Sequence, residues 1–416
     1  TMNIDQASHP LTRIDEATRL FHGSIRLARL ETEALPLQDC LGRILGKDVV
    51  APRDVPDLDQ SAVDGYAVSA KDTFGASQTN PALLRLKAPS QEPEPTIASG
   101  EAIYVHTGSP TPKGSDAVIM IEYTKKIEPE TIEVYKPVSP GEDVSWRGED
   151  VRSGEVILKE GTRLKPQDLG MLASLDINSV EVFKKPIVGI LSTGSELVPP
   201  GSERKRGQAV EINSIILSAM VRECGGEPFP LGIAKDDFEA IRTQIKEGLR
   251  RSDVLLVTGG TSVGQMDLTT KAIESLGEPG IIVHGIAMRP GRPTALASLE
   301  GKPVLNLSGY PVAAMIGFYI FGKPLLEKLL RTEREPEPRI RARVTSRVAS
   351  AIGMRIFVRV HVTKDGEDYV AEPVRTTGSG IVSSMIKANG LMVIPEELEG
   401  VDENAEVDII LFRPIE

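Results

Sequence analysis

The spacing of apolar residues changes from one stretch of this chain to the next. Near the N-terminus, LTRIDEATRLFHGSIRLAR repeats apolar residues at helical intervals and predicts a helix. From about 50 to 140, prolines and glycines separate short β-branched pieces such as AIYVHTG, DAVIMIE and TIEVYKP, which predict a small β module. Further along, GEVIL predicts a strand. Pro166 predicts the start of a helix, because proline is favoured at the first helical position.

Strands and helices alternate over residues 185–331. The predicted strands are PIVGILST, EPFPLGIA, DVLLVTGG, IIVHGIAM and KPVLNLSG, and the predicted helices are NSIILSAMVRECGG, FEAIRTQIKEGLRR, LTTKAIESLG and PVAAMIGFYIFGKPLLEKLLR. Asn213 is predicted to cap the first of these helices and Pro311 to open the last. Because this alternation implies right-handed crossovers, it predicts one α/β domain with a mostly parallel, doubly wound sheet.

The end of the chain returns to a strand pattern. RTEREPEPR, residues 331–339, is charged and contains prolines, so we interpret it as a linker. RIRARVTSRV, RIFVRVHVT, YVAEPVR and AEVDIILF then predict short strands separated by turns. Residues 337–416 are therefore expected to form a compact all-β domain. Residues 1–184 are expected to form a mixed N-terminal region with the β module inserted at about 51–140.

Composition narrows the class of protein. A chain of 416 residues exceeds one ordinary core, so about two to four domains are expected. Its 40% hydrophobic and 26% charged residues are typical of a soluble globular protein. Lys and Arg total 48 against 59 Asp and Glu, so the net charge is −11. This charge argues against a general nucleic-acid binder, which needs a basic face, but it leaves room for a local cationic pocket.

Cysteine and histidine usage excludes some kinds of site. Only Cys40 and Cys224 occur, without paired spacing, so neither a disulfide framework nor a cysteine-based zinc site is expected. The five histidines are scattered singly. TMNIDQASHPLTRIDEATRL lacks the features of a signal peptide, and the longest apolar runs are too short to span a membrane. We therefore expect a cytoplasmic protein without a membrane partner.

Loops at predicted strand ends carry unusual residues. In an open α/β sheet, ligands bind where the carboxyl ends of strands meet helix N-termini. The loop STGSEL contains Thr193, Gly194 and Glu196, and the loop AKDDF contains Asp236. Asp237 in the second loop has a simpler interpretation as the N-cap of the following helix.

The segment DVLLVTGGTSVGQMD, residues 253–267, holds the largest group of candidate residues. Its glycines permit positive φ and a backbone N–H nest that suits an anion, and its hydroxyl groups add donors. These residues are Gly259, Gly260, Thr261, Ser262 and Gly264. The loop has neither Walker nor Rossmann spacing, so a tight structural turn is the alternative interpretation.

This segment ends in a carboxylate, Asp267, within a chain that is acidic overall. Glu196, Asp236 and Asp267 would repel an anionic ligand unless a cation lay between them and it. A Mg²⁺ ion would reconcile these charges with a ligand phosphate, so we predict the three carboxylates as its ligands. The alternative is that Asp267 caps the next helix and Glu196 is a solvated turn residue.

Two further stretches favour anions. AMRPGRPTALASL places Arg289 and Arg292 on a Pro-Gly turn, where guanidinium groups suit a phosphate or another oxyanion. A solvated basic turn is the alternative for this pair. SGYPVAAM places Ser308, Gly309 and Pro311 at a helix N-terminus, which also favours negative charge.

The N-terminal half has polar turns of its own. DLDQSAVDGYAV, VHTGSPTPKGSDAVIMIE and RGEDVRSG gather carboxylates and hydroxyl groups around glycines. Because Asp, Ser and Gly are turn formers, residue chemistry alone permits these to be ordinary turns.

An ordered set of motifs resembles a known family. SAVDGYAV, HTGSPTPKGSDAVIM, RGEDV, GTRL, ILSTGSEL, GQAVEINS, LGIAKDD, TGGTSVGQMD, RPGRP and SGYPVAAM occur in that order. Together they resemble the MoeA-type molybdenum insertases, to which the E domain of gephyrin belongs. The similarity covers roughly residues 10–413.

The resemblance implies an activity and an assembly. Such enzymes take adenylylated molybdopterin and molybdate, cleave the phosphoanhydride with Mg²⁺, and release AMP and molybdenum cofactor. They are elongated homodimers with the active site at the subunit interface. The family also implies a central domain similar to MogA-type adenylyltransferases and a small C-terminal β-barrel.

The resemblance also assigns residues and partners. Asp64, Thr107 and Asp150 match polar residues that the N-terminal half brings to the cleft from the partner subunit. The three carboxylates of the α/β domain match its acidic cluster, and all six residues are expected to be catalytic. A MogA- or MoaB-type adenylyltransferase and downstream cofactor-handling proteins are the expected partners, without nucleic acid.

Four positions depart from the family pattern. Tyr310 stands where the family usually has Asn, arginines 289 and 292 stand where lysines are frequent, and Gln60 replaces a common Asn. These changes leave a tungstate-preferring enzyme and a non-catalytic binding or scaffold paralogue as alternatives. A molybdopterin adenylyltransferase is a third alternative, but the extra N- and C-terminal domains argue against it.

Overall fold

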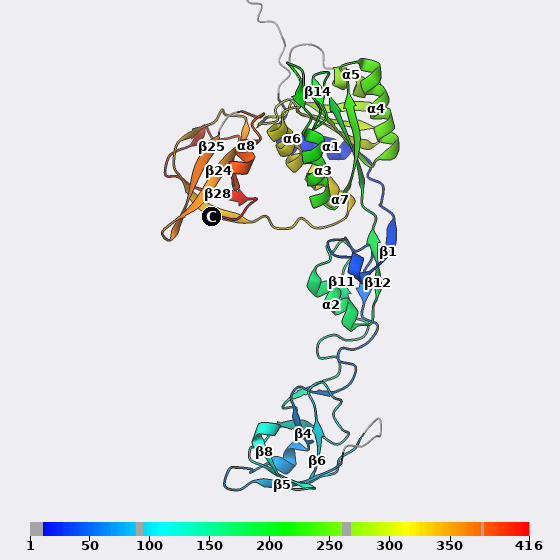
Figure 1. Ribbon diagram of the computed structural model, residues 1–416, viewed down its shortest axis with the longest axis vertical. Helices are drawn as coiled ribbons and strands as arrows, with labels where there is room; N and C mark the ends of the chain where they lie inside the picture. The colour runs from blue at the N-terminus through cyan, green and yellow to red at the C-terminus, as the bar shows by residue number, and fades with distance from the viewer. Residues whose placement is uncertain (1–10, 89–94, 260–267, 376–377, 416) are drawn as a thin grey trace, which may run out of the picture.

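The parts of the chain follow one another along an elongated shape (Figure 1). The computed structural model describes residues 11–88, 95–259, 268–375 and 378–415. A small β module lies at one end and the α/β domain towards the other, with a short mixed region between them and the C-terminal domain beside the α/β domain. None of the helices in the described parts of the chain is long and apolar enough to cross a membrane.

The β module is a six-stranded sheet with the strand order β7-β4-β6-β5-β9-β8. Its strands are β4 (Gly65–Val68), β5 (Ala82–Leu86), β6 (Glu101–Val105), β7 (Ala117–Met120), β8 (Thr124–Glu128) and β9 (Thr131–Val134). The short pair β3 (Gln60–Ser61) and β10 (Val144–Ser145) and the 3₁₀ turns η2 (Ala70–Thr73) and η3 (Ile121–Tyr123) complete it. Alternating apolar residues, among them Leu84, Ile119 and Ile132, form its core.

The region between module and α/β domain pairs strands that are distant in sequence. Its elements are β1 (Thr32–Pro36), η1 (Leu37–Asp39), β2 (Val49–Val50), β11 (Val156–Leu158), α2 (Pro166–Ser174) and β12 (Ser179–Phe183). β1 pairs with β12 and β2 with β11, both antiparallel. Pro166 opens α2 as predicted.

The N-terminal helix α1 (Ile14–Ser24) packs away from the region that follows it in sequence. It contacts β18 and β20 of the α/β sheet. Its buried residues Ile14, Ala17 and Phe21, spaced for one helical face, belong to the core of that domain.

The α/β domain is built on a six-stranded sheet with the order β16-β13-β17-β21-β20-β18. Its strands are β13 (Ile187–Thr193), β16 (Glu227–Ala234), β17 (Val254–Thr258), β18 (Pro279–His284), β20 (Ala295–Leu299) and β21 (Lys302–Leu307), with the short β14 (Leu197–Val198), β15 (Ala209–Val210) and β19 (Met288–Arg289) outside it. The helices are α3 (Asn213–Glu223), α4 (Phe238–Arg251), α5 (Leu268–Glu274), α6 (Pro311–Gly317) and α7 (Lys323–Leu329). One core lies between the sheet and α4 and α5, and another lies on the opposite face with α1, α3, α6 and α7.

One edge of this sheet differs from the expected pattern. β16, β13, β17 and β21 are parallel, but β20 and β18 are antiparallel. The strands predicted from the sequence do not include β20. The turn from β20 to β21 contains Glu300 and Gly301 with φ of 54° and 83°, and two such residues form a tight hairpin turn.

The last predicted helix of the domain is not one regular helix. A π-helical segment, η4 (Phe318–Gly322), separates α6 from α7. Pro324 explains the interruption, because it has no N–H to donate to the carbonyl group four residues earlier and its ring crowds that carbonyl.

The C-terminal domain is a closed barrel. Its strands pair in the order β24-β25-β22-β28-β26, and β26 pairs back with β24. These strands are β22 (Arg339–Val344), β24 (Arg355–Asp365), β25 (Asp368–Arg375), β26 (Gly390–Ile394) and β28 (Glu406–Leu411), joined by β23 (Val348–Ala349), α8 (Ser383–Lys387) and β27 (Gly400–Val401). The predicted fold class is confirmed: an α/β domain, a mixed N-terminal part with a β module, and a small barrel.

Candidate functional site

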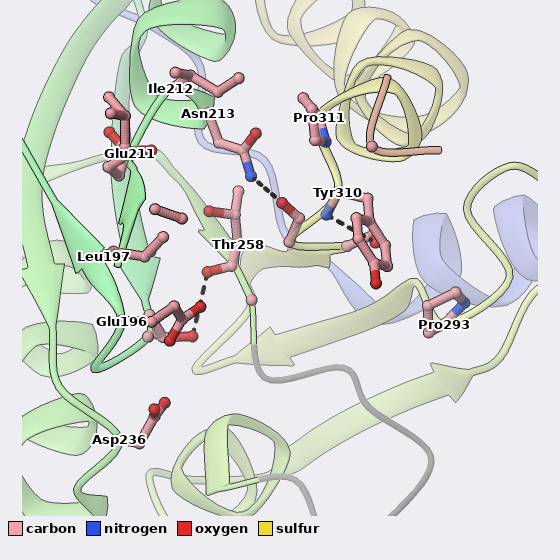
Figure 2. Close-up of a pocket in the computed structure, with 18 residues that line it drawn as sticks. Glu196, Leu197, Glu211, Ile212, Asn213, Asp236, Thr258, Pro293, Tyr310 and Pro311 are labelled. Carbon is pink, nitrogen blue, oxygen red and sulfur yellow. Dashed lines mark hydrogen bonds between the residues drawn. The ribbon is translucent and has the colours of Figure 1, made fainter. Parts of the chain in front are cut away.

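A pocket of about 920 Å³ opens at the carboxyl ends of the parallel strands (Figure 2). Loops that follow β13, β16, β17 and β21 meet there, as expected for an open α/β sheet. The predicted site residues that line it are Thr193, Gly194, Glu196, Asp236, Gly259, Ser308, Gly309 and Pro311. Gly260, Thr261, Ser262, Gly264 and Asp267 lie outside the described residues.

Two of the predicted carboxylates reach this pocket on exposed side chains, Glu196 and Asp236. Asp236 Oδ2 accepts a hydrogen bond of 2.8 Å from the backbone N–H of Ser195. The backbone N–H of Asp236 in turn donates to Ser195 Oγ at 3.0 Å. This reciprocal pair ties the loops after β13 and β16 together and places both acidic residues on one wall.

Asp236 is not needed as a helix cap. The neighbouring Asp237 caps α4, because its Oδ1 accepts a 2.8 Å hydrogen bond from the backbone N–H of Ala240. The capping interpretation of Asp237 is therefore confirmed, and the exposed Asp236 carboxylate remains available to a ligand.

Carboxylate oxygens are suitable ligands for Mg²⁺, which commonly binds one or two protein carboxylates and completes its shell with phosphate oxygens and water. Glu196 and Asp236 supply such a pair on the pocket wall. Within the described ranges, no group of three or more His, Cys, Asp or Glu side chains is arranged to hold a metal ion. These two carboxylates therefore fit a cation that completes its shell with ligand oxygens and water.

Two glycines at the pocket have positive φ, and at one of them, Gly259, two backbones also approach closely. Gly259 has φ of 103°, and a Cβ there would lie 2.3 Å from the carbonyl oxygen of Thr193. Gly194 has φ of 152°, and a Cβ there would lie 2.8 Å from the carboxylate oxygens of Glu196. Thr193 Oγ1 donates to the carbonyl oxygen of Thr258 at 3.2 Å, as the dashed line in Figure 2 shows.

The pocket lining also contains Glu211 and Asn213, which the sequence did not predict as site residues. Glu211 is buried, and its Oε1 accepts hydrogen bonds from Ser192 Oγ at 2.9 Å and the Ser214 backbone N–H at 2.8 Å. Asn213 is the first residue of α3 rather than its cap, and its Nδ2 donates to the carbonyl oxygen of Gly309 at 2.9 Å. The capping role predicted for Asn213 is therefore wrong, because Glu211 takes the hydrogen bond from the helix N–H.

A second pocket of about 460 Å³ adjoins the first. The two share Pro293, Ser308 and Tyr310 in their walls. The second is lined by Arg289, Arg292 and, from β24 of the barrel, Arg359, which is only 1% exposed. β19 pairs with β24, so the barrel and the α/β domain are joined at this pocket.

Three guanidinium groups around one cavity suit an oxyanion. Arg359 was not predicted, because its surroundings in the sequence are those of an ordinary strand.

Asp64 and Thr107 form a separate polar site in the β module. Asp64 Oδ1 accepts hydrogen bonds from the backbone N–H of Thr107 at 2.8 Å and from its Oγ1 at 3.1 Å. These bonds lower the pKa of the Asp64 carboxyl, with a smaller contribution from nearby His106. Asp150 is exposed on another turn of the N-terminal half.

A single chain does not bring these N-terminal residues to the strand-end pocket. The described lining of that pocket contains neither Asp64, Thr107 nor Asp150. Figure 1 shows the reason, since the β module and the α/β domain are separated by the intervening region.

Three family models match consecutive parts of the chain. "MoeA N-terminal region (domain I and II)" matches residues 12–175, "Probable molybdopterin binding domain" matches 189–328, and "MoeA C-terminal region (domain IV)" matches 341–412. Together they follow the order of the parts described above.

Similar proteins cover nearly the whole chain. A protein of Methanocaldococcus jannaschii named for molybdopterin biosynthesis is 39% identical over 391 residues, which are 92% of this chain and 93% of that one. The molybdopterin molybdenumtransferase of Bacillus subtilis is 32% identical over 389 residues, 92% of this chain and 90% of its own. A solved structure of a molybdopterin biosynthesis MoeA protein from Pyrococcus horikoshii has a TM-score of 0.83 at 36% identity, covering 97% of this chain and 100% of that one.

Proposed function

The chain belongs to the MoeA family of molybdopterin molybdenumtransferases, enzymes of molybdenum cofactor biosynthesis, and from this we propose that it inserts molybdate into adenylylated molybdopterin. In the proposed reaction, water adds to one phosphorus of the phosphoanhydride. The bridging oxygen leaves with the other phosphoryl group, so that AMP and the pterin phosphate separate. The two dithiolene thiols of molybdopterin then bind molybdenum through their sulfurs, and one molybdate oxygen leaves as water with the two thiol protons, without a change of oxidation state.

The observation that carries this proposal is the pair of adjoining pockets. Backbone and hydroxyl groups at the strand ends suit the phosphates of a nucleotide, and the second pocket presents three guanidinium groups to an oxyanion. The shared wall of Pro293, Ser308 and Tyr310 would keep molybdate beside the pterin nucleotide. Holding both substrates in adjoining sites makes their reaction effectively intramolecular.

We propose that Glu196 and Asp236, together with Asp267 outside the described residues, hold Mg²⁺. The bound ion would neutralise charge between these carboxylates and the phosphates as the anhydride is cleaved. The reciprocal hydrogen bonds between Asp236 and Ser195 hold the two loops in position for this task.

We further propose that the active form is a homodimer in which Asp64, Thr107 and Asp150 reach the pocket of the other subunit. The separation of the β module from the α/β domain supports this arrangement, because one chain alone leaves these residues distant from the pocket. A carboxylate whose pKa is lowered, as for Asp64, is ionised at neutral pH and suits interaction with a cation or a donor.

The chemistry of the substrates implies further partners. An adenylyltransferase of the MogA or MoaB type must supply adenylylated molybdopterin, and cofactor-handling proteins must receive the product. Both cysteine thiols are free, in keeping with the reducing cytoplasm that we propose as the compartment.

AMP release tests the proposed reaction. Purified protein with adenylylated molybdopterin, Mg²⁺ and molybdate is expected to release AMP, measured by chromatography. Asp236→Ala should lower the rate on the order of a hundredfold or more, because it removes a proposed ligand of the Mg²⁺ that would stabilise the charge of the transition state. Asp237→Ala is the matched control. It removes the cap of α4 and should cost only about 1 kcal/mol of stability.

The controls separate the alternatives. Absence of AMP with both molybdate and tungstate would overturn the enzymatic proposal and favour a non-catalytic paralogue. Turnover with tungstate alone would identify a tungstate enzyme. An equal rate for Asp236→Ala and wild type would show that the carboxylate assignment is wrong.

A further inference from the structure

Tyr310 is an exposed aromatic residue in a pocket wall. The residue belongs to the turn that joins β21 to α6, lines both pockets and is 64% exposed. Aromatic residues make up 4% of the chain. Among the described residues that line the two pockets, Tyr310 is the one aromatic residue. Aromatic side chains usually bury much of their area, so a ring left open here has surface available to a ligand.

The backbone of Tyr310 is held in place. Its N–H donates to Ser308 Oγ at 3.2 Å, and its carbonyl oxygen accepts from the Ala314 N–H at 2.9 Å within the first turn of α6. The preceding carbonyl group, of Gly309, accepts the hydrogen bond from Asn213. Figure 2 shows the ring projecting from this turn, away from Pro311.

The ring of Tyr310 also packs against the barrel domain. A Cβ on Gly380 would lie 3.1 Å from Cδ1 and 3.5 Å from Cε1 of Tyr310, so the ring lies against the backbone of this glycine. The same loop of the barrel domain accepts a hydrogen bond of 3.0 Å, from the Val312 N–H to the Ser379 carbonyl oxygen. The ring therefore has a firm support on one side and open pocket on the other.

We propose that Tyr310 is the specificity-determining residue that stacks on a planar heteroaromatic ring of the bound substrate. This inference rests on the proposed function, in which the substrate carries two such rings, a pterin and an adenine. Backbone groups and arginines serve the phosphates and the oxyanion, whereas the rings have no other aromatic partner among the described lining residues. A supported tyrosine has two side-chain torsions to order, so its ring contributes contact area at low entropic cost.

Binding measurements with ring-bearing and ring-free ligands test this role. Calorimetry would compare AMP, unsubstituted pterin and ribose 5-phosphate on wild type, Tyr310→Ala and Tyr310→Phe. Stacking on one ring predicts that Tyr310→Ala binds AMP or pterin about fivefold to a hundredfold more weakly, with ribose 5-phosphate unchanged. Whichever of the two ligands is affected identifies the stacked ring. Tyr310→Phe keeps the ring and should restore binding. Phe74→Ala removes an equally exposed aromatic residue, 62% exposed and outside both pockets, and serves as the control.

Several results would overturn the stacking role. One is unchanged binding of AMP and pterin by Tyr310→Ala. Another is an equal loss for ribose 5-phosphate, which would mean that the residue positions the phosphate site. A third is a changed molar mass in light scattering with unchanged affinities, which would place the ring in a subunit contact. Wild-type protein that turns over while Tyr310→Ala binds normally refutes this inference alone. Wild-type protein that neither binds nor turns over refutes the proposed function as well.

Discussion

At the scale of single residues, the hydrogen bonds of one polar turn keep the carboxyl group of Asp64 in its ionised form. The hydrogen bonds from the Thr107 backbone N–H and then its hydroxyl group stabilise the ionised form and lower the pKa of Asp64. A carboxyl group whose pKa is lowered in the folded state stabilises the fold. This contribution is complete at a pH above the pKa of the unfolded chain, and it is lost as the pH falls through the lowered pKa of the folded state. The sequence predicted both residues through family resemblance, but only the structure joins them.

Thr107→Ala should raise the pKa of Asp64 part of the way towards its ordinary value. The substitution removes the hydroxyl donor and leaves the stronger backbone donor in place. Carbon-detected NMR of the aspartate carboxyl groups would follow this titration, with Thr107→Ser as the control that keeps the hydroxyl. An identical titration in all three proteins would show that the hydroxyl bond does not act on Asp64.

Other site residues were predictable to different degrees. Gly194 and Gly259 were found because glycine after a strand permits positive φ or a close backbone approach. The structure has positive φ at both and the close backbone approach at Gly259. Arg359 and Glu211 were missed, since one lies in a barrel strand and the other before a helix, without a local signal of either site.

At the scale of elements, hydrogen bonds of Glu337 hold the linker to the barrel against η4 and α7. Its side chain accepts hydrogen bonds from Tyr319 of η4 at 2.6 Å, from Lys323 of α7 at 3.2 Å and from Arg334 at 3.0 Å. Burial by itself would raise the pKa of Glu337, but the bonds from Tyr319 and Arg334 outweigh it and the net pKa is lowered. The linker predicted from composition is therefore anchored at its C-terminal end.

Glu337→Ala should lower the free energy of unfolding by about 1.5–3 kcal/mol, because it leaves several donors without their charged acceptor. Since the pKa of Glu337 is lowered, the difference from wild type should be full near neutral pH and shrink as acid protonates the carboxylate. Urea titrations at several pH values would measure the difference in the free energy of unfolding between the two proteins. Glu333→Ala, at an exposed position of the same linker, is the control and should stay within about 0.5 kcal/mol of wild type. A pH-independent difference would contradict the role of the charge.

At the scale of the whole molecule, the order of parts in space differs from their order in sequence. We keep 1–184, 185–331 and 337–416 as proposed domain boundaries. α1, at the start of the first range, nevertheless packs in the core of the second. The β module extends away from the α/β domain, which leaves its polar turns available to another copy of the chain.

Mixing two inactive variants tests whether the site is shared between subunits. If Asp64 of one subunit acts with Asp236 of the other, protein reassembled from Asp64→Asn and Asp236→Asn chains should recover about a quarter of wild-type AMP release. Half of the dimers are then mixed, and each mixed dimer has one intact site. Each variant assayed alone is the control. No recovery, with mixed dimers verified by mass spectrometry, would mean that the site does not combine these residues across subunits.

The sequence by itself determined the periodic elements, the division into α/β and all-β parts, and eight of the residues that line the strand-end pocket. These features depend on local rules: side-chain periodicity, and the fact that carboxyl ends of parallel strands meet at one edge. Only the tertiary structure decided the antiparallel edge of the sheet and the packing of α1 in the core of the α/β domain. It also decided the joining of Arg289 and Arg292 with Arg359. Contacts between residues distant along the chain produce these features, and no local pattern encodes which distant segments will meet.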